Sequence, residues 1–480
     1  MATESLIRAL QGIVGVDHVF HRPEDLLVFE YDAYLETGRP TVVVQPARAE
    51  EVARVVAVAA REGLPIVPRG GATGLSGGAV AVRGGVMVDL NRMCRVLEVR
   101  VDDRMALVEP GLINTDLSAA VAADGLYYAP DPSSQRASTI GGNIAENAGG
   151  PHCLARGMTT NHVLGLELVA GEGETYHLGG PAPDAPGYDL TGVVVGSEGT
   201  LGVVTAAWVR LLPLPPTTVT FLALFGSLEA AGEAVSEIIA RGIVPSALEL
   251  IDGPTARALE EAFRAGYPAN IEGVLLIDLD GRPEDVAEEA AVVEAVCREI
   301  GARGVRSAES AQEREALWAA RKGGLAALAR IAPNYYLHDM VVPRSRLAAT
   351  LKRVLAIADE HGVFVSNVAH AGDGNLHPTI LFDLRQPGIL PKIIEAGEAI
   401  LRVGVEAGGT ISGEHGIGLE KQEYMAWIFG PDDLAVMRRV RDAFSPGELF
   451  NPGKLFPQGS PREARIKVWA SAAVRSDTWI

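Results

Sequence analysis

The order of apolar and polar positions predicts that strands and helices alternate along most of the chain. Residues 1–36 predict an N-terminal helical arm, because apolar side chains there recur at helical spacing. Residues 41–45 then predict a strand, residues 49–62 an amphipathic helix, and residues 64–67 a second strand. A strand, a crossover helix and a strand in this order indicate a βαβ unit.

The stretch between this unit and a proline run at residues 212–216 predicts a further strand-rich region. Its expected elements are a short helix at 114–124 and strands at 86–90, 95–109, 163–170 and 193–195. The proline run stiffens the chain and cannot continue a strand ladder. We therefore expect a domain boundary there.

The second half of the chain alternates strands with amphipathic helices, which predicts an antiparallel or mixed sheet covered by helices. The strands are expected at 218–225, 247–251, 273–279, 335–342, 363–369 and 379–382, and the helices at 227–241, 283–300, 310–330, 344–361 and 391–407. The expected organisation is a helical arm (1–36), a first domain (37–216), a second domain (217–456) and a C-terminal tail (457–480).

The composition is that of a globular protein with several domains. Of 480 residues, 48% are hydrophobic and 21% charged, while 54 glycines and 29 prolines indicate many tight loops. Lysine and arginine number 42 against 61 acids, so the formal net charge is 42 − 61 = −19. Such a surface repels nucleic acid and anionic lipid, but it is compatible with a local basic pocket for an anionic substrate.

The cysteines and the lack of a long apolar run narrow the expected location. Cys94, Cys153 and Cys297 form no Cys-x-x-Cys pair, which argues against a disulfide framework, a structural zinc site or an iron–sulfur cluster. The N-terminus is typical of a helix rather than a signal peptide. No apolar stretch approaches the ~20 residues needed to span a bilayer. We expect a soluble, cytoplasmic protein, or one held peripherally at the inner face of the membrane by partner subunits.

Three glycine-rich segments carry the strongest functional signal, at residues 67–78, 131–150 and 194–204. Glycine lets the backbone turn through positive φ and approach a ligand closely, so that amide N–H groups can converge on pyrophosphate oxygens. One such segment alone is more often an ordinary surface turn. Three in order favour a phosphate-bearing cofactor.

These segments resemble a flavoenzyme family when they are taken with His-Ala-Gly-Asp-Gly-Asn-Leu-His-Pro at 370–378 and Ser-Gly-Glu-His-Gly-Ile-Gly at 412–418. Over residues 37–456 the chain is similar to FAD-linked oxidases of the vanillyl-alcohol oxidase and p-cresol methylhydroxylase superfamily. Within it, the likeness is to FAD-binding subunits of glycolate oxidase and to D-lactate dehydrogenases. The resemblance implies an α+β fold, with a two-subdomain p-cresol methylhydroxylase-type FAD-binding domain. A C-terminal substrate domain with a mostly antiparallel sheet covered by helices would follow.

The same resemblance implies FAD as the cofactor, bound noncovalently because the first segment holds no histidine for flavin attachment. The first segment would hold the pyrophosphate, the second the ribityl chain and isoalloxazine, and the third the adenosine side. The residues implied to contact FAD are Pro68, Arg69, Gly70, Gly71, Ala72, Thr73, Gly74, Gly77, Gly78, Asp131, Pro132, Ser133, Ser138, Gly141, Gly142, Asn143, Asn147, Ala148, Gly149, Glu198, Gly199, Val204 and Asn451.

A candidate metal site accompanies the cofactor segments. His370 and His377 flank a turn that can bring two imidazoles to one point, and Glu414 would add a carboxylate. Two histidines and a carboxylate suit Zn, Mn or Fe with positions left for substrate. Two histidines at this spacing are by themselves more often ordinary loop residues, and it is the resemblance that favours a divalent metal.

Three further residues are implied to act on the substrate. His415 would take the hydroxyl proton, a role that suits an imidazole at neutral pH. Arg321 would bind the substrate carboxylate through its planar fork, and Asn375 would donate to the substrate. The ordinary alternatives are a third metal ligand or structural donor for His415 and a solvated helix charge for Arg321.

The expected function is FAD-dependent oxidation of a small 2-hydroxy acid, glycolate or D-lactate, to the 2-oxo acid. Hydride would pass to flavin N5 while the metal and a histidine assist loss of the hydroxyl proton. The alternatives are a D-2-hydroxyglutarate-type dehydrogenase on the same fold, a metal-dependent hydrolase and a noncatalytic subunit. The resemblance implies flavin and iron–sulfur partner subunits as electron acceptors, while a quinone, a cytochrome or oxygen stays open.

Overall fold

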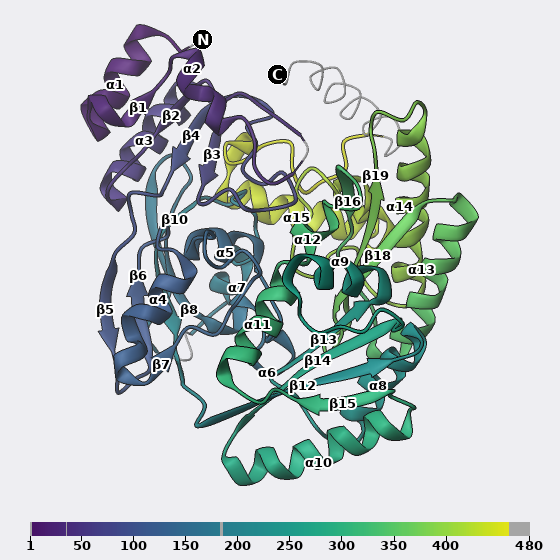
Figure 1. The fold of residues 1–480 in the computed structure, drawn as a ribbon. Coiled ribbons are helices and arrows are strands. Elements are labelled where there is room, and N and C mark those ends of the chain that lie inside the picture. The colour runs from purple at the N-terminus through teal and green to yellow at the C-terminus, as the bar shows by residue number, and fades with distance from the viewer. Residues whose placement is uncertain (1, 35, 183–185, 460–480) are drawn as a thin grey trace. The chain divides into compact units, whose positions relative to one another are not determined.

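The computed structural model describes residues 2–34, 36–182 and 186–459 of the chain, which folds into two compact units (Figure 1). The first unit comprises Met1–Gly149, Gly157–Leu214 and Glu414–Ile480, and the second comprises Gly150–Arg156 and Pro215–Gly413. The change of unit after Leu214 falls within the proline run. The return to the first unit at Glu414 lies inside the expected second domain. Residues 460–480 of the expected tail lie outside the described residues.

The first sheet of the first unit contains the predicted βαβ arrangement. Its strand order is β1-β2-β4-β3, formed by β1 (Val19–Phe20), β2 (Val42–Val44), β4 (Val86–Asp89) and β3 (Ile66–Arg69). Strands β2 and β3 both run parallel to β4, which lies between them, and α3 (Ala49–Arg61) is the crossover. The predicted N-terminal helix is α1 (Glu4–Val14), and its buried side chains join α3 in one apolar cluster.

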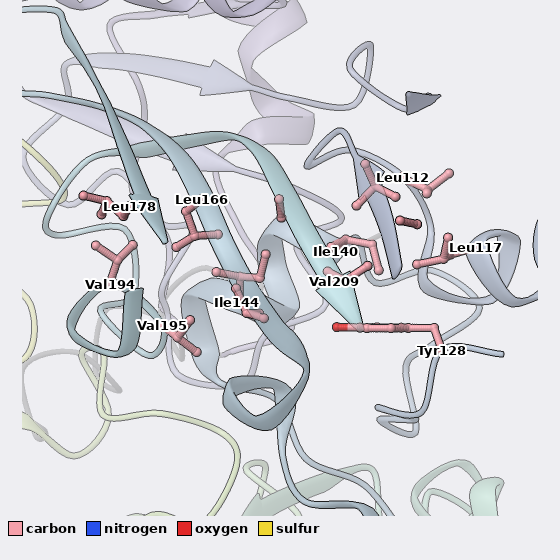
Figure 2. Packing of buried hydrophobic residues seen from close by; sticks show 14 of the residues in the cluster. Leu112, Leu117, Tyr128, Ile140, Ile144, Leu166, Leu178, Val194, Val195 and Val209 are labelled. Atoms are coloured by element: carbon pink, nitrogen blue, oxygen red, sulfur yellow. The ribbon is translucent and has the colours of Figure 1, made fainter. Parts of the chain in front are cut away.

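The second sheet of the first unit is antiparallel, in the order β5-β6-β10-β8-β9. Its strands are β5 (Val96–Arg100), β6 (Met105–Val108), β10 (Val203–Arg210), β8 (Val163–Ala170) and β9 (Glu174–Gly179). Figure 2 shows the core on this sheet, where Ile140 and Ile144 of α5 (Ile140–Glu146) lie among side chains such as Leu166 and Val209. The second glycine-rich segment is thus anchored by apolar packing.

Two expected strands differ from the structure. Residues 95–109 form the two strands β5 and β6, joined by a turn at 101–104. Residues 193–195 belong to the end of a helical turn, α7 (Leu190–Val194), and Asp189 caps that turn by accepting from the Gly192 N–H at 2.8 Å. A run of three apolar residues has no period, so the capping carboxylate decides the conformation. The remaining elements of this unit are α2 (Pro23–Leu26), α4 (Asn114–Val121), β7 (Leu126–Tyr127), β11 (Leu212–Pro213) and α15 (Pro431–Phe444).

The second unit is built on one antiparallel sheet, as expected. Its order is β15-β12-β14-β13-β18-β19-β16, with β17 also paired to β19. The strands are β15 (Gly304–Ser307), β12 (Thr217–Phe225), β14 (Gly273–Gly281), β13 (Ala247–Asp252), β18 (Phe364–His370), β19 (Asn375–Phe382), β16 (Asn334–Leu337) and β17 (Met340–Val341). The single strand expected at 335–342 is divided by His338 and Asp339.

Helices cover both faces of this sheet (Figure 1). One face carries α9 (Gly253–Phe263), α11 (Ala311–Lys322) and α12 (Gly324–Leu328), which share an apolar cluster with Leu222 and Leu276. The opposite face carries α8 (Leu228–Ala240), where Gly273 of β14 lies against Ala231. The other helices of this unit are α6 (Cys153–Arg156), α10 (Pro283–Glu299), α13 (Leu347–His361) and α14 (Ile389–Glu406). In residues 2–34, 36–182 and 186–459, no helix has both the length and the apolar character needed to cross a bilayer.

Candidate cofactor and substrate sites

The three glycine-rich segments come together inside the first unit. A Cβ on Gly70 would collide with Thr139 Oγ1, and one on Gly71 would collide with the Ala137 carbonyl, so the first segment packs backbone to backbone on the second. The third segment joins them, since a Cβ on Gly199 would lie 3.2 Å from Pro68. Only glycine permits this approach.

Hydrogen bonds tie the third segment to both others. The Gly196 and Glu198 N–H groups donate to the carbonyls of Ile144 and Ala145, at 2.9 and 2.8 Å. Asn451 reaches the same place from the far end of the chain, because its Nδ2 donates to the carbonyls of Gly78 and Glu198 at 2.9 and 2.7 Å. The structure therefore places Asn451, predicted as a cofactor contact, as the side chain that joins the first and third segments.

Several buried polar atoms on these segments fit a large polar cofactor. Ser138 Oγ, Asn143 Nδ2 and Asn451 Oδ1 are buried, and within the described part of the chain they have no hydrogen-bond partner. Buried polar atoms are nearly always paired in native proteins. Together with the glycine-lined approach, such atoms match the hydroxyls, phosphates and ring edges of a flavin nucleotide.

The Arg69 side chain serves the N-terminal arm. Its guanidinium donates to the carbonyls of Tyr31 and Val28, at 2.9 and 3.4 Å, and lies over the Phe29 ring. Burial lowers the pKa of Arg69, although Asp89 and Asp32 oppose this shift. The charge of Arg69 is thus engaged by residues 28–31, while its backbone ends β3 within the first segment.

Charged side chains lie beside the glycine-rich segments. Glu198 was expected from the resemblance as a cofactor contact, whereas Glu146 and Lys454 were not singled out by the sequence. The Glu198 carboxylate accepts the N–H groups of Ile417 and Gly418, both at 2.7 Å, and Lys454 Nζ donates to the Gly78 carbonyl at 2.5 Å. Burial raises the pKa of Glu198 and, well above its usual range, that of Glu146. Two backbone N–H donors oppose the rise for Glu198, so the pKa of Glu146 is raised further than that of Glu198. Burial also lowers the pKa of Lys454 to about 8.

In the second unit, the predicted histidine pair lies on a β-hairpin. His370 ends β18 and His377 lies in β19, where it pairs with Val368. Their rings are 5.1 Å apart and nearly perpendicular, and a nitrogen of each lies within 4.8 Å of the other. Asp373 shapes the turn by accepting from the Asn375 N–H at 3.1 Å. The structure thus brings the two imidazoles together as the turn sequence predicts.

A carboxylate that the sequence did not reveal joins His370 to Arg321. Glu249 of β13 lies 2.8 and 3.0 Å from His370 Nδ1 through its two oxygens, and 2.5 Å from an Arg321 guanidinium nitrogen. All three side chains are buried, and Glu249 is 0% exposed. Arg321 Nε has no hydrogen-bond partner among the described residues. The only sequence signal for Glu249 is an acid in an otherwise apolar strand, Ala-Leu-Glu-Leu-Ile.

A second buried acid, Asp339, stands beside His377. Asp339 Oδ1 is 3.9 Å from His377 Nδ1, and Oδ2 accepts from Ser412 Oγ at 2.8 Å and from the Gly413 N–H at 2.9 Å. Gly413 is the last residue of this unit, and Glu414 and His415 follow it as part of the first unit. His415 Nε2 lies 3.9 Å from a Glu414 oxygen. Two imidazoles with carboxylates nearby form a donor set that fits a divalent metal.

Two family models match the chain. Residues 40–179 match the model described as FAD binding domain, and residues 214–455 match that described as FAD linked oxidases, C-terminal domain. The first match contains the first two glycine-rich segments. The second contains Glu249, Arg321 and both histidines of the hairpin.

Similar proteins include two whose names indicate that they act on small hydroxy acids. The chain is 44% identical over 456 residues to the glycolate oxidase subunit GlcD of Escherichia coli (strain K12), covering 94% of this chain and 91% of that one. It is 32% identical over 426 residues to the D-lactate dehydrogenase of Anaerostipes hadrus, covering 86% and 89%. The solved structure of p-cresol methylhydroxylase with substrate bound shares the fold, at a TM-score of 0.79 and 16% identity over 94% of this chain and 96% of that one.

Proposed function

This chain belongs to the FAD-linked oxidases, and we propose that it oxidises glycolate or D-lactate to the corresponding 2-oxo acid. Its relatives by sequence are a glycolate oxidase subunit and a D-lactate dehydrogenase, so the reaction class is FAD-dependent oxidation of small 2-hydroxy acids. The observation that carries the substrate class is the buried group of Arg321, His370 and His377. A guanidinium and two imidazoles suit an anionic substrate with a neighbouring hydroxyl.

We propose that the three glycine-rich segments and Asn451 hold FAD, which when bound supplies the acceptor for the hydride that leaves the substrate Cα. Backbone N–H groups of residues 69–78 would face the pyrophosphate, as the family resemblance implies. Ser138 and Asn143 would pair their buried polar atoms with the nucleotide. Uptake of FAD by the apoprotein, followed by its visible absorbance, tests this part.

The substrate's acid group is assigned to Arg321. Glu249 lies 2.5 Å from one guanidinium nitrogen, and Arg321 Nε is a buried donor from which a substrate carboxylate can accept. A guanidinium has five N–H donors, so it can serve both carboxylates at once. Asn375, which is buried at the start of β19, would donate its amide to the substrate.

For the hydroxyl, we propose His370, His377 and Glu414 as ligands of Zn, Mn or Fe, with His415 as the base. Glu414 is joined by a peptide bond to Gly413, whose N–H is held by Asp339 beside His377. A metal there would supply Lewis acidity to the hydroxyl and carboxylate oxygens. His415 would accept the hydroxyl proton. Loss of this proton from oxygen and of hydride from Cα converts the alcohol into the carbonyl group of the 2-oxo acid.

We also propose that the chain works with other subunits. The similar bacterial protein is named as a subunit, and the electrons must leave the flavin after each turnover. A flavin subunit and an iron–sulfur subunit at the inner face of the membrane are the proposed partners, with the chain itself cytoplasmic.

The test is anaerobic reduction of the bound flavin by glycolate, D-lactate, L-lactate and D-2-hydroxyglutarate, each with and without a chelator. Bleaching by glycolate or D-lactate is the expected result. Preferential bleaching by D-2-hydroxyglutarate would change the assigned substrate but keep the reaction class. No bleaching by any acid would refute the proposal. A metal-dependent hydrolase would leave the flavin oxidised throughout.

A further inference from the structure

We propose that Glu249 is a positioning residue that sets the orientation of His370 and Arg321 together. This inference rests on the proposed function, in which His370 binds a metal and Arg321 binds the substrate carboxylate. None of the three side chains is near another in sequence: Glu249 lies on β13, His370 on β18 and Arg321 on α11.

The first step concerns the imidazole. The ion pair with Arg321 makes Glu249 a carboxylate, which accepts hydrogen bonds and donates none. The proton facing it must therefore be on His370 Nδ1, at 2.8 Å from one oxygen and 3.0 Å from the other. The lone pair of the neutral ring then belongs to Nε2. Histidines that bind metals commonly donate their other N–H to a carboxylate in this way, which fixes the tautomer and the ring plane.

The second step concerns rigidity. Strands β13 and β18 are adjacent and antiparallel, with Leu250 opposite Ala369, so Glu249 and His370 meet across one ladder. Glu249 is 0% and His370 4% exposed, so both side chains are enclosed by protein atoms. The carboxylate is thus held by the sheet, and it holds the imidazole in turn.

The third step concerns the guanidinium. Arg321 comes from α11 on one face of the sheet, and its side chain is 6% exposed. A buried guanidinium without an anion is strongly unfavourable. Glu249 supplies that anion, at 2.5 Å from a guanidinium nitrogen. The same carboxylate therefore aligns the metal ligand and the substrate-binding cation, and its loss should disturb both.

Asp278 supplies a matched control. It is a buried carboxylate on β14, the neighbour of β13, and it accepts from Trp318 Nε1 of the same helix α11 at 3.0 Å. It also accepts from Thr220 Oγ1. Within the described part of the chain, neither His370 nor Arg321 is among its side-chain partners. Asp278→Asn thus removes a buried acid that secures α11 without touching the two functional side chains.

The experiment compares wild type, Glu249→Gln, Glu249→Asp and Asp278→Asn as full-length, FAD-loaded chains. Titration of metal-depleted protein with Zn²⁺ alone and Mn²⁺ alone should show affinity about 10- to 100-fold weaker in Glu249→Gln. Its KM for glycolate or D-lactate should rise as well, and Glu249→Asp should recover part of both. Asp278→Asn should keep wild-type metal affinity and KM even where its melting temperature falls.

A measurement on the wild-type chain guards against a variant that does not fold. In protein labelled with ¹⁵N-histidine, with His370 assigned by its substitution, the ring should show the proton on Nδ1. An Nδ1 that carries no proton in the metal-depleted chain would overturn the inference. Equal metal affinity and KM in Glu249→Gln and Asp278→Asn would also overturn it, while flavin reduction by wild type would still uphold the proposed function. If no acid reduces the wild-type flavin, the function fails instead, and metal affinity and ring tautomer still decide the role of Glu249.

Discussion

The two units use buried acids for different purposes. In the first unit, Glu198 accepts backbone N–H groups of residues 417 and 418, and Lys454 donates to the Gly78 carbonyl. In the second unit, Glu249 contacts the side chains of His370 and Arg321. The first arrangement holds glycine-rich backbone that has few side chains of its own to anchor it. The second aligns side chains that do chemistry.

This difference predicts which measurements each substitution changes. Loss of a charge in the first unit should weaken FAD retention and stability through the backbone it secures. Loss of a charge in the second should alter substrate and metal binding with FAD still bound. A substitution that crosses these categories would break the comparison.

The largest effect is expected from substitution of His415, the proposed base, which belongs to the first unit. Glu198 fixes the neighbouring residues Ile417 and Gly418, so His415→Asn should leave the loop and the FAD content unchanged. Loss of a general base typically costs about 10²- to 10⁴-fold. Stopped-flow flavin reduction should slow by this factor. Loss of FAD from the variant would instead indicate that His415 serves in cofactor binding.

Arg321→Met should have the next largest effect, mainly on stability. It leaves Glu249 buried beside His370 without its cation, and breaking a buried ion pair costs about 3–5 kcal/mol. Denaturant unfolding measures this loss, and KM for the hydroxy acid should rise in the same variant. Arg353→Met is the control, because Arg353 pairs with Glu360 on the surface and its loss should change neither quantity.

Glu198→Gln should have a smaller effect, confined to FAD binding by the glycine-rich segments. An amide oxygen cannot hold both N–H groups as strongly as a carboxylate, and hydrogen bonds to charged groups contribute about 1.5–3 kcal/mol. FAD should dissociate faster, with KM little changed in the loaded enzyme. Glu146→Gln is the matched control, since burial already raises the pKa of Glu146 well above its usual range and an amide resembles its protonated form. Equal FAD loss in both variants would contradict the assigned difference.

Sequence patterns predicted the parts that depend on local order. The strands of the second unit follow from apolar runs, and the hairpin of His370 and His377 follows from the turn residues between them. The meeting of the glycine-rich segments was expected from the resemblance, and the packing of Gly70 on Thr139 shows why glycine is required there. Each of these features leaves a mark within a short stretch of chain.

Features that depend on distant partners were not visible in this way. The role of Glu249 comes from His370, which is 121 residues away, and from Arg321, which is also distant in sequence. The return of the chain to the first unit depends on a bridge between Ile66 and Phe450 and on the Asn451 N–H, which donates to the Ile66 carbonyl at 2.7 Å. Neither acid nor bridge has a periodic signature, so only the fold reveals them.

The smallest expected effect is a pH dependence of stability due to Lys454. Burial lowers its pKa from 10.5 to about 8, so between these values the unfolded chain binds more protons than the folded chain. Stability should therefore rise with pH across this window, by about 1–3 kcal/mol from this group. Denaturation midpoints measured from pH 7.5 to 10.5, in steps of about half a unit, should show the rise in wild type and lose it in Lys454→Met. Lys392→Met, at an exposed lysine that donates to the Gly362 carbonyl, should keep the wild-type profile. If Lys454→Met also kept the wild-type pH profile, burial would not lower the pKa of Lys454 in the folded chain. The backbone of the first unit would then not depend on a buried cation that desolvation destabilises.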